Sequence, residues 1–251
     1  DVSYALLPIG FSTGAVVALI LLEPDFGTAV SVLVIASAMI FAAGISYKYV
    51  LGMALAAAPA LWVVAMAQPY RVERITAFLN PWSDPQGAGY QVIQSMIAVG
   101  TGGFLGTGLM GGMQKLFYLP EAHNDFIYAV IAEEFGLLGA TTVLLCFGVI
   151  TWRGLRTATR APDRFGAFLA VGLTTMIAFQ AFLNISVVTG LAPTKGIPLP
   201  FVSAGGSSLL INLIGMAILL NVSQHASSAN GGTQVISMAT AKPAACRRTV
   251  S

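Results

Sequence analysis

Six long apolar stretches alternate along this chain with short breaks that are polar or contain proline and glycine. Each stretch is close to the roughly 20 residues that a helix needs to cross the hydrocarbon core of a bilayer. A break such as 23–27 combines charges with a proline and a glycine, which interrupt an apolar helix. The pattern predicts an all-α fold, a polytopic transmembrane helix bundle, with spans at about 2–22, 28–44, 49–67, 126–152, 165–189 and 207–222.

Two segments depart from this alternation. Residues 68–125 form the longest stretch between apolar segments and hold much of the polar chemistry of the chain. They predict a large extracytoplasmic loop within a membrane domain of residues 1–225. Residues 226–251 are rich in Ser, Thr, Ala and Gly, which predicts a disordered tail.

The basic residues divide between the two faces of the predicted bundle. Six spans place Lys48, a cluster of four arginines between 153 and 164, and the basic tail on one face. Arg71, Arg74, Lys115 and Lys195 fall on the other. Since cytoplasmic loops carry an excess of Lys and Arg, the arginine-rich face is expected to be cytoplasmic and residues 68–125 to lie outside.

Composition excludes several classes of protein. With 56% hydrophobic and only 9% charged residues, the chain could not present the surface of a soluble globule. The net charge of +2 is too small to indicate binding to nucleic acid. Cys146 and Cys246 stand in unlike surroundings and indicate neither a disulfide nor a metal site.

Asp125 is the first candidate for chemistry, because it stands where a proline-led loop meets the fourth span. In one interpretation Asn124 or Asp125 only caps that helix. In the other, Asp125 is a general base, which must be ionised to accept a proton. A stripe of small residues one helical face below it would hold it against a neighbouring span: Ala129, Ala132, Gly136 and Gly139.

Other polar residues have both structural and functional interpretations. Glu133 and Glu134 fall inside the fourth span, where a structural hydrogen-bonding role is favoured over a proton path. His123 has no second His or Cys at ligand spacing, so a loop hydrogen bond is favoured over a metal site. The glycine string 100–108 lacks the strand and Lys of a nucleotide loop and predicts a re-entrant or sharply turning loop.

The four basic residues on the outer face also have two interpretations. Each one alone could bind lipid headgroups or pair with Glu73, Asp84 or Glu121. Together with Asp125 they suit an anionic, lipid-linked substrate, because guanidinium groups bind phosphate in bidentate fashion.

Several longer motifs resemble one known family. Residues 71–82 read RVERITAFLNPW and residues 84–91 read DPQGAGYQ; residues 114–127 read QKLFYLPEAHNDFI, and PTKG at 193–196 is followed by SAGGSS at 203–208. With PDFGT at 24–28, these motifs are similar to signatures of the SEDS glycosyltransferases, in the FtsW or sporulation type rather than the elongation type. The resemblance covers about residues 1–225. The family has ten spans, so the four amino-terminal spans are expected to be missing from this chain.

The resemblance implies an enzyme of septal cell division in the bacterial cytoplasmic membrane that polymerises lipid II into glycan strands. Asp125 matches the family's essential aspartate and would deprotonate the 4-hydroxyl of the acceptor GlcNAc, which displaces undecaprenyl pyrophosphate from MurNAc with inversion. The substrate-binding candidates are Arg71, Arg74, Lys115, Glu121, His123 and Lys195. A divalent cation, Mg or Mn, is the one candidate cofactor, and the implied partners are the growing glycan and a class B penicillin-binding transpeptidase with other divisome membrane proteins.

Two other functions stay open at this point. A lipid II flippase or other transporter would use Glu133, Glu134 and broken helices near the middle of the membrane. A non-catalytic divisome scaffold would recruit the transpeptidase and use Asp125 only as a cap. Whether the chain is of the division or the sporulation type, and what the tail does, also stay open.

Overall fold

A computed structural model describes residues 2–23, 25–66, 68–113, 120 and 122–239. Every regular element in these residues is a helix, as the apolar pattern predicts. Six helices correspond to the six predicted spans: α1 (Val2–Leu22), α2 (Phe26–Ala42), α3 (Tyr47–Met66), α6 (Ile127–Arg160), α7 (Arg164–Val188) and α8 (Gly206–Ala239). Among the described residues, α6, α7 and the part of α8 up to His225 are long and apolar enough to cross a membrane, and 6–22 and 26–42 are shorter apolar helices.

Two helices run further than predicted. α6 continues to Arg160 rather than ending near 152, and α8 continues to Ala239 rather than near 222. The prediction of a disordered tail from 226 is therefore corrected as far as Ala239, while residues 240–251 lie outside the described residues. A helix that is already formed gains one hydrogen bond for each residue added, so a segment rich in Ala and Ser can extend it although its composition is typical of disorder.

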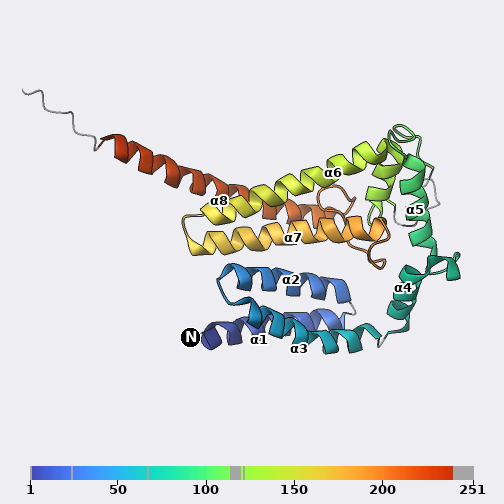
Figure 1. Ribbon diagram of the computed structural model, residues 1–251, viewed down its shortest axis with the longest axis horizontal. Helices are drawn as coiled ribbons and strands as arrows, with labels where there is room; N and C mark the ends of the chain where they lie inside the picture. Colours follow the sequence, from blue (N-terminus) through green and yellow to red (C-terminus); the bar gives the residue numbers. More distant parts are fainter. Residues whose placement is uncertain (1, 24, 67, 114–119, 121, 240–251) are drawn as a thin grey trace, which may run out of the picture.

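The described part of the predicted outer loop contains three short helical elements. They are α4 (Pro69–Leu79), the 3-10 turn η1 (Pro81–Ser83) and α5 (Tyr90–Gly102). In Figure 1, α4 and α5 lie across one end of the bundle, and we call this the site end. The α2–α3 and α6–α7 connections lie at the opposite end, which agrees with the predicted separation of Lys48 and the arginine cluster from Arg71, Arg74 and Lys195.

α7 is the central helix of the fold. It packs against α2 on one side and against α6 and α8 on the other (Figure 1). Through α7, the α1–α2 hairpin is held beside the α6–α8 group, so the start of α2 lies at the same end as the start of α6.

α6 is broken at Gly136, where φ is 64° and ψ is −159°. The 103–108 loop enters the break and satisfies the backbone groups on both sides. Leu137 N donates to Gly103 O at 2.8 Å, and Thr107 N donates to Glu133 O at 3.0 Å. The predicted turning loop at 100–108 therefore fills a gap in the fourth span.

The small-residue stripe is buried at three of its four positions, but it packs against α5 of the predicted outer loop and not against a neighbouring span. Ala129, Ala132 and Gly136 are buried, and a side chain at Gly102 of α5 would overlap Ala132 O. Gly139 faces side chains of its own helix, because its nearest neighbours are atoms of Phe135 and Ile131. The stripe therefore brings α5 close to the first half of α6.

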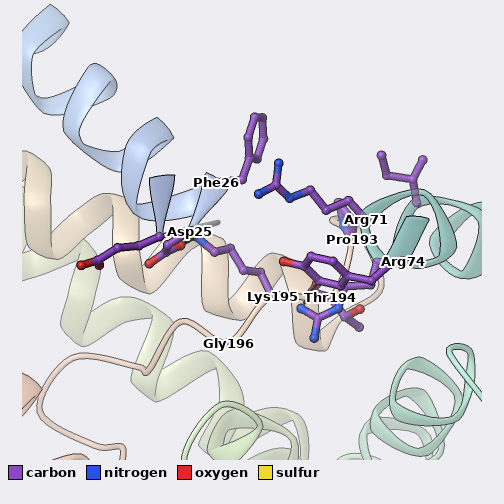
Figure 2. A pocket seen from close by; sticks show the side chains of 11 residues that line it. Asp25, Phe26, Arg71, Arg74, Pro193, Thr194, Lys195 and Gly196 are labelled. Atoms are coloured by element: carbon purple, nitrogen blue, oxygen red, sulfur yellow. Dashed lines mark hydrogen bonds and ion pairs between the residues drawn. The ribbon is translucent and has the colours of Figure 1, made fainter. Parts of the chain in front are cut away.

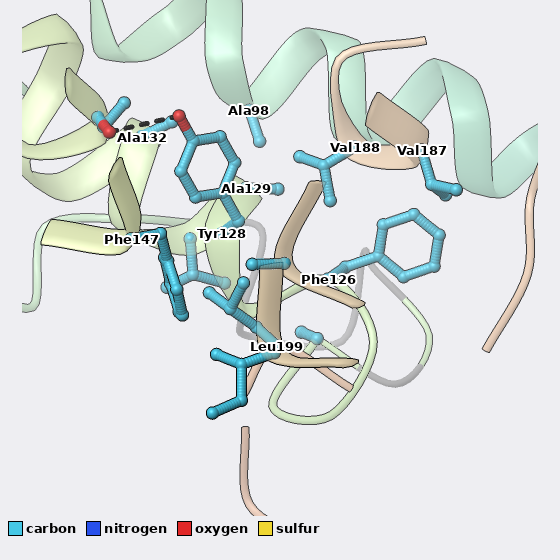
Figure 3. Close-up of a cluster of buried hydrophobic side chains, with 14 residues drawn as sticks. Ala98, Phe126, Tyr128, Ala129, Ala132, Phe147, Val187, Val188 and Leu199 are labelled. Atoms are coloured by element: carbon cyan, nitrogen blue, oxygen red, sulfur yellow. Dashed lines mark hydrogen bonds between the residues drawn. The ribbon is translucent and has the colours of Figure 1, made fainter. Parts of the chain in front are cut away.

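A buried hydrophobic cluster supports the start of α6 (Figure 3). Phe126, Val188 and Leu199 come from three different segments and are each at most 3% exposed. Tyr128 Oη donates to Ala140 O at 3.1 Å, which ties the two halves of α6 together across the break. Burial of each large apolar side chain contributes about 1.5–3 kcal/mol, so this cluster fixes the backbone that precedes α6.

Candidate functional site

Asp125 lies two residues before α6 and is half-buried. The N-cap position of this helix belongs to Phe126, whose side chain makes no cap hydrogen bond. The helix therefore begins one to two residues later than the capping interpretation of Asn124 or Asp125 places it. Asp125 is placed by other contacts.

Three successive carbonyl groups hold the segment that carries Asp125. Ala204 N donates to His123 O at 3.1 Å, and Ser203 Oγ donates to Asn124 O at 2.5 Å. Asn184 Nδ2 of α7 donates to Asp125 O at 2.7 Å. These donors come from α7 and from the 190–206 loop, so the backbone at 123–125 is bound to both.

Asn184 also binds the 190–206 loop itself. Its amide donates to Ile197 O at 2.7 Å in addition to Asp125 O, and the residue is only 1% exposed. A buried amide must satisfy its donors, and here one amide joins two segments that are far apart in sequence. We call the contacts of Asn184, Ser203 and Ala204 with residues 123–125 the backbone clamp.

The carboxylate of Asp125 packs against Gly196. A Cβ atom added at Gly196 would come within 2.7 Å of Asp125 Oδ2. A larger residue at 196 would push the carboxylate away from this position. The acid and the 193–196 motif, separated by about 70 residues of sequence, are therefore neighbours in space.

The same motif lines a cavity of about 520 Å³, which we call the basic cavity (Figure 2). It is enclosed by the α1–α2 turn, α4 and the 193–196 motif. Arg71, Arg74 and Lys195 supply three positive charges, and Glu23 and Asp25 supply two negative charges, so the formal charge of the lining is +1. Arg71, Arg74 and Lys195 were predicted to act together, and the structure brings them together.

Lys195 is held at the rim by an ion pair. Its Nζ lies 2.9 Å from Asp25 Oδ1, and the side chain passes over Gly27, where any Cβ would overlap it. Partial burial by itself raises the pKa of Asp25, but hydrogen bonds from Thr28 and Lys195 outweigh it and lower the pKa to about 2. Asp25 is thus ionised at neutral pH and keeps Lys195 directed along the cavity wall.

The two arginines are held by their surroundings in different ways. The Arg71 side chain is 7% exposed, and its Cζ lies 5.8 Å from the centre of the Phe26 ring. Arg74 Nη1 donates to Thr194 O at 3.2 Å and its Cζ lies 5.3 Å from the Tyr70 ring centre. Contacts of a guanidinium with aromatic faces hold the charged group in place.

The remaining predicted polar residues have different outcomes. Lys115 and Glu121 lie outside the described residues. His123 is exposed and contributes its backbone carbonyl to the clamp. Glu133 is 2% exposed and its carboxylate accepts from Met113 N at 2.9 Å, which agrees with the structural role favoured for it.

Sequence reasoning missed Asp25, Asn184 and Ser203 as parts of the site. Asp25 and Ser203 stood in motifs of the family resemblance, and Asn184 is a polar residue in an apolar span, which is a signal for a buried hydrogen bond. Among the described residues, no three His, Cys, Asp or Glu side chains gather as a metal site.

Comparison with known proteins identifies the family. A sequence model described as "cell cycle protein", which covers FtsW, RodA and SpoVE, matches residues 2–228. This chain belongs to the SEDS family. It is thus a multi-pass membrane protein, and the predicted all-α membrane fold is confirmed.

Relatives of this SEDS chain include a probable peptidoglycan glycosyltransferase FtsW of Geobacter sp. (strain M18). The two are 51% identical over 210 residues, which are 84% of this chain and 57% of the relative. Stage V sporulation protein E of Bacillus subtilis (strain 168) is 48% identical over 207 residues, 82% of this chain and 57% of its own length. The chain thus spans little more than half the length of these curated relatives.

Two solved structures share the fold. One belongs to a peptidoglycan synthase complex described as coordinating polymerization and crosslinking; it has a TM-score of 0.70 and 33% identity, over 89% of this chain and 62% of that chain. The other is a mutant of the rod shape determining protein RodA of Thermus thermophilus, with a TM-score of 0.59 and 26% identity, over 88% of this chain and 57% of that chain.

Proposed function

We propose that this SEDS chain is the catalytic part of a peptidoglycan glycosyltransferase that polymerises lipid II at the outer face of the bacterial cytoplasmic membrane. The names of its relatives support this class of activity. The observation that carries the proposal is the placement of Asp125 against Gly196, at the edge of a cavity lined by Arg71, Arg74 and Lys195.

In the proposed reaction Asp125 is the general base. Its carboxylate takes the proton from the 4-hydroxyl of the acceptor GlcNAc as that oxygen attacks the anomeric carbon of the donor MurNAc. The bond between this carbon and the diphosphate oxygen breaks, the configuration inverts, and undecaprenyl pyrophosphate leaves. The backbone clamp matters here because a base acts only when it is held within hydrogen-bond reach of the proton.

The basic cavity would hold the diphosphate. Negative charge grows on the departing oxygen in the transition state, and prearranged cationic donors stabilise it. Arg71 and Arg74 are already fixed by aromatic and backbone contacts, so little reorganisation is needed. Lys195 would exchange Asp25 for a phosphate oxygen, a substitution of one anion for another at the same ammonium group.

The decisive experiment replaces Asp125 by Asn and measures glycan polymer formed from lipid II by the protein in membranes or detergent. We expect polymerisation to fall by about 10²-fold or more, the contribution of a positioned base. Folding should be kept, because Asn has nearly the same size as Asp and the clamp binds the backbone carbonyl at 125; circular dichroism and thermal unfolding check this.

The matched control is Asp163→Asn. Asp163 caps α7 by accepting from Gly166 N at 2.7 Å, at the opposite end of the bundle. Asn is also a good N-cap, so this variant should keep both stability and activity. Unchanged polymer formation by Asp125→Asn would refute the enzyme proposal and favour a scaffold.

One observation favours a transporter as the second candidate. α6 is discontinuous at Gly136, and discontinuous helices mark substrate sites in transporters. Here, however, the 103–108 loop fills the break and Glu133 binds the backbone at Met113. If the chain is a transporter, Glu133→Gln should abolish lipid II movement in proteoliposomes. Our proposal instead expects Asp125→Asn to stop polymerisation, whatever the result of the transport assay.

The proposal extends to partners and location. The solved synthase complex, described as joining polymerization with crosslinking, supports a transpeptidase as the partner of this chain. We propose a class B penicillin-binding protein in this role, and the division septum as the place of action. The chain is 51% identical to an FtsW relative and 48% identical to a sporulation relative, so sequence identity does not decide between the division and the sporulation type.

A further inference from the structure

A second pocket of about 280 Å³ lies beside the basic cavity at the site end, and no role above uses it. We call it the amide pocket. The two spaces share Tyr70, Arg74 and Thr194, so the hydrogen bond from Arg74 to Thr194 O stands in the wall between them. Its own lining includes Gln86, Tyr90 and Gln91, which belong to the family motif at 84–91.

The chemistry of the amide pocket differs from that of the basic cavity. Glu73 and Arg74 are its charged lining residues and their formal charges cancel, whereas the basic cavity carries +1. Glutamine amides each offer two donors and an acceptor, and a tyrosine offers an apolar ring with a hydroxyl group. Such a lining suits a neutral ligand with hydroxyl and amide groups and offers no excess charge to an anion.

One wall of the amide pocket is built in advance. Asp84 accepts from Gly87 N at 3.0 Å and from Ala88 N at 3.2 Å, and Gly89 N donates to Asp84 O at 3.1 Å. A side chain at Gly89 would overlap Pro81 O, so the turn can close only with glycine there. The turn sets Gln86 on one side and begins α5, which presents Tyr90 and Gln91, on the other.

The amide pocket is also close to Asp125. Thr194 lines it, and Gly196, against which Asp125 packs, is two residues further along the chain. Two residues of chain span at most about 7 Å. Gly196 itself lines the basic cavity, so the proposed base lies beside the 194–196 segment that borders both spaces.

We infer that the amide pocket is a saccharide subsite that binds an N-acetylhexosamine unit next to the reacting bond. This rests on the proposed function and deepens it: the basic cavity takes the diphosphate and the amide pocket takes the sugar. The amides of Gln86 and Gln91 are the groups that recognise the acetamido and hydroxyl groups of the unit.

The test is direct binding of two soluble probes to the protein reconstituted in nanodiscs, without catalysis. Chitotetraose, a neutral N-acetylglucosamine oligomer, probes the amide pocket, and inorganic pyrophosphate probes the basic cavity. We expect Q86A/Q91A to weaken chitotetraose binding about tenfold or more, with pyrophosphate binding within about twofold of wild type. Lys195→Met should show the reverse pattern.

Two controls separate this outcome from other causes. Gln68→Ala removes an exposed glutamine that lines neither space and should leave both affinities unchanged. Asp125→Asn should bind chitotetraose like wild type even though it does not polymerise, so the subsite and the proposed activity are tested separately. The inference is overturned if wild type shows no saturable chitotetraose binding, if Q86A/Q91A binds it normally, or if Lys195→Met loses it to the same extent.

Discussion

At the scale of single residues, the ion pair of Asp25 and Lys195 makes part of the stability depend on pH. The pKa of Asp25 is lowered in the folded protein to about 2 from an ordinary value of 3.8. A carboxyl group with a depressed folded pKa stabilises the fold above its unfolded pKa and loses that contribution as pH falls through the folded value. The contribution should thus be complete above about pH 4 and vanish between pH 4 and 2.

Comparison of wild type with Asp25→Asn measures this effect. The variant should unfold at a lower temperature than wild type at pH 7, and the difference should shrink as pH falls toward 2. Thermal unfolding in detergent at pH 7, 5, 4 and 3 gives both curves. A difference between the two proteins that is the same at every pH would show that the carboxylate charge at 25 contributes nothing.

Asn184 is expected to position Asp125 through the backbone. Asn184→Leu keeps a similar volume and removes both hydrogen bonds, to Asp125 O and to Ile197 O. Leaving those buried carbonyls unpaired should cost about 1–3 kcal/mol of unfolding free energy. Because the base is then held less firmly, kcat should fall more than about tenfold while KM for lipid II changes much less.

The matched variant for Asn184 is Asn212→Leu in α8. Asn212 is also buried, at 4% exposed, but its amide donates within its own helix to Ser208 O at 2.8 Å. Asn212→Leu should lower the free energy of unfolding, and it should not lower kcat selectively as Asn184→Leu does. Equal kinetic effects of the two variants would mean that Asn184 acts only on the fold.

At the scale of elements, the break in α6 depends on the backbone freedom of Gly136. Its φ of 64° with ψ of −159° is a conformation that essentially only glycine adopts without strain. Gly136→Ala should therefore destabilise the protein by at least about 1–3 kcal/mol, and an added Cβ would also meet Gly106 and Phe104. Chemical denaturation in mixed micelles measures the change.

Gly148, which lies in the half of α6 after the break, is the control. It is exposed, and nothing lies within 4 Å of an added Cβ. Gly148→Ala should be neutral or slightly stabilising, because alanine favours the helix by about 0.5–1 kcal/mol. If Gly136→Ala behaved like Gly148→Ala, α6 would not be broken there.

The elements also show what could be predicted from the sequence. The spans follow from runs of apolar residues, because only length and hydropathy decide whether a helix can cross a membrane. The break at Gly136 was not predicted: its glycine was assigned to a packing stripe, and the partner that fills the gap, the 103–108 loop, lies some 30 residues earlier. A local pattern carries no information about which distant carbonyl will accept a hydrogen bond.

The candidate site was likewise predicted in part. Arg71, Arg74, Lys195 and Asp125 were assigned to one face because charges in a membrane protein gather where water is, and the structure places them at one end. Asp25 was missed because its pairing with Lys195 joins positions 170 residues apart. Asn184 was missed because its amide binds backbone carbonyls, and backbone carbonyls are present at every residue and give no signal in the sequence.

At the scale of the whole molecule, the two ends of the bundle differ in charge. The site end carries α4, η1 and the 190–206 loop, and the opposite end carries the α6–α7 turn with its arginines (Figure 1). The proposed chemistry requires the site end to face outward, because lipid II is polymerised outside the cytoplasm in that proposal. The excess of Lys and Arg at the opposite end predicts this orientation.

Cysteine labelling in intact cells tests that orientation. In a background with Cys146 and Cys246 replaced by Ala, Ser83→Cys places an exposed thiol in η1 at the site end, and Pro162→Cys places one in the exposed α6–α7 turn. Neither change alters the number of charged residues, so neither should reverse the topology by itself. A membrane-impermeant maleimide should label position 83 in intact cells and position 162 only after permeabilisation. The reverse pattern would leave Asp125 and the basic cavity on the cytoplasmic side, where they could not extend a glycan strand outside the membrane.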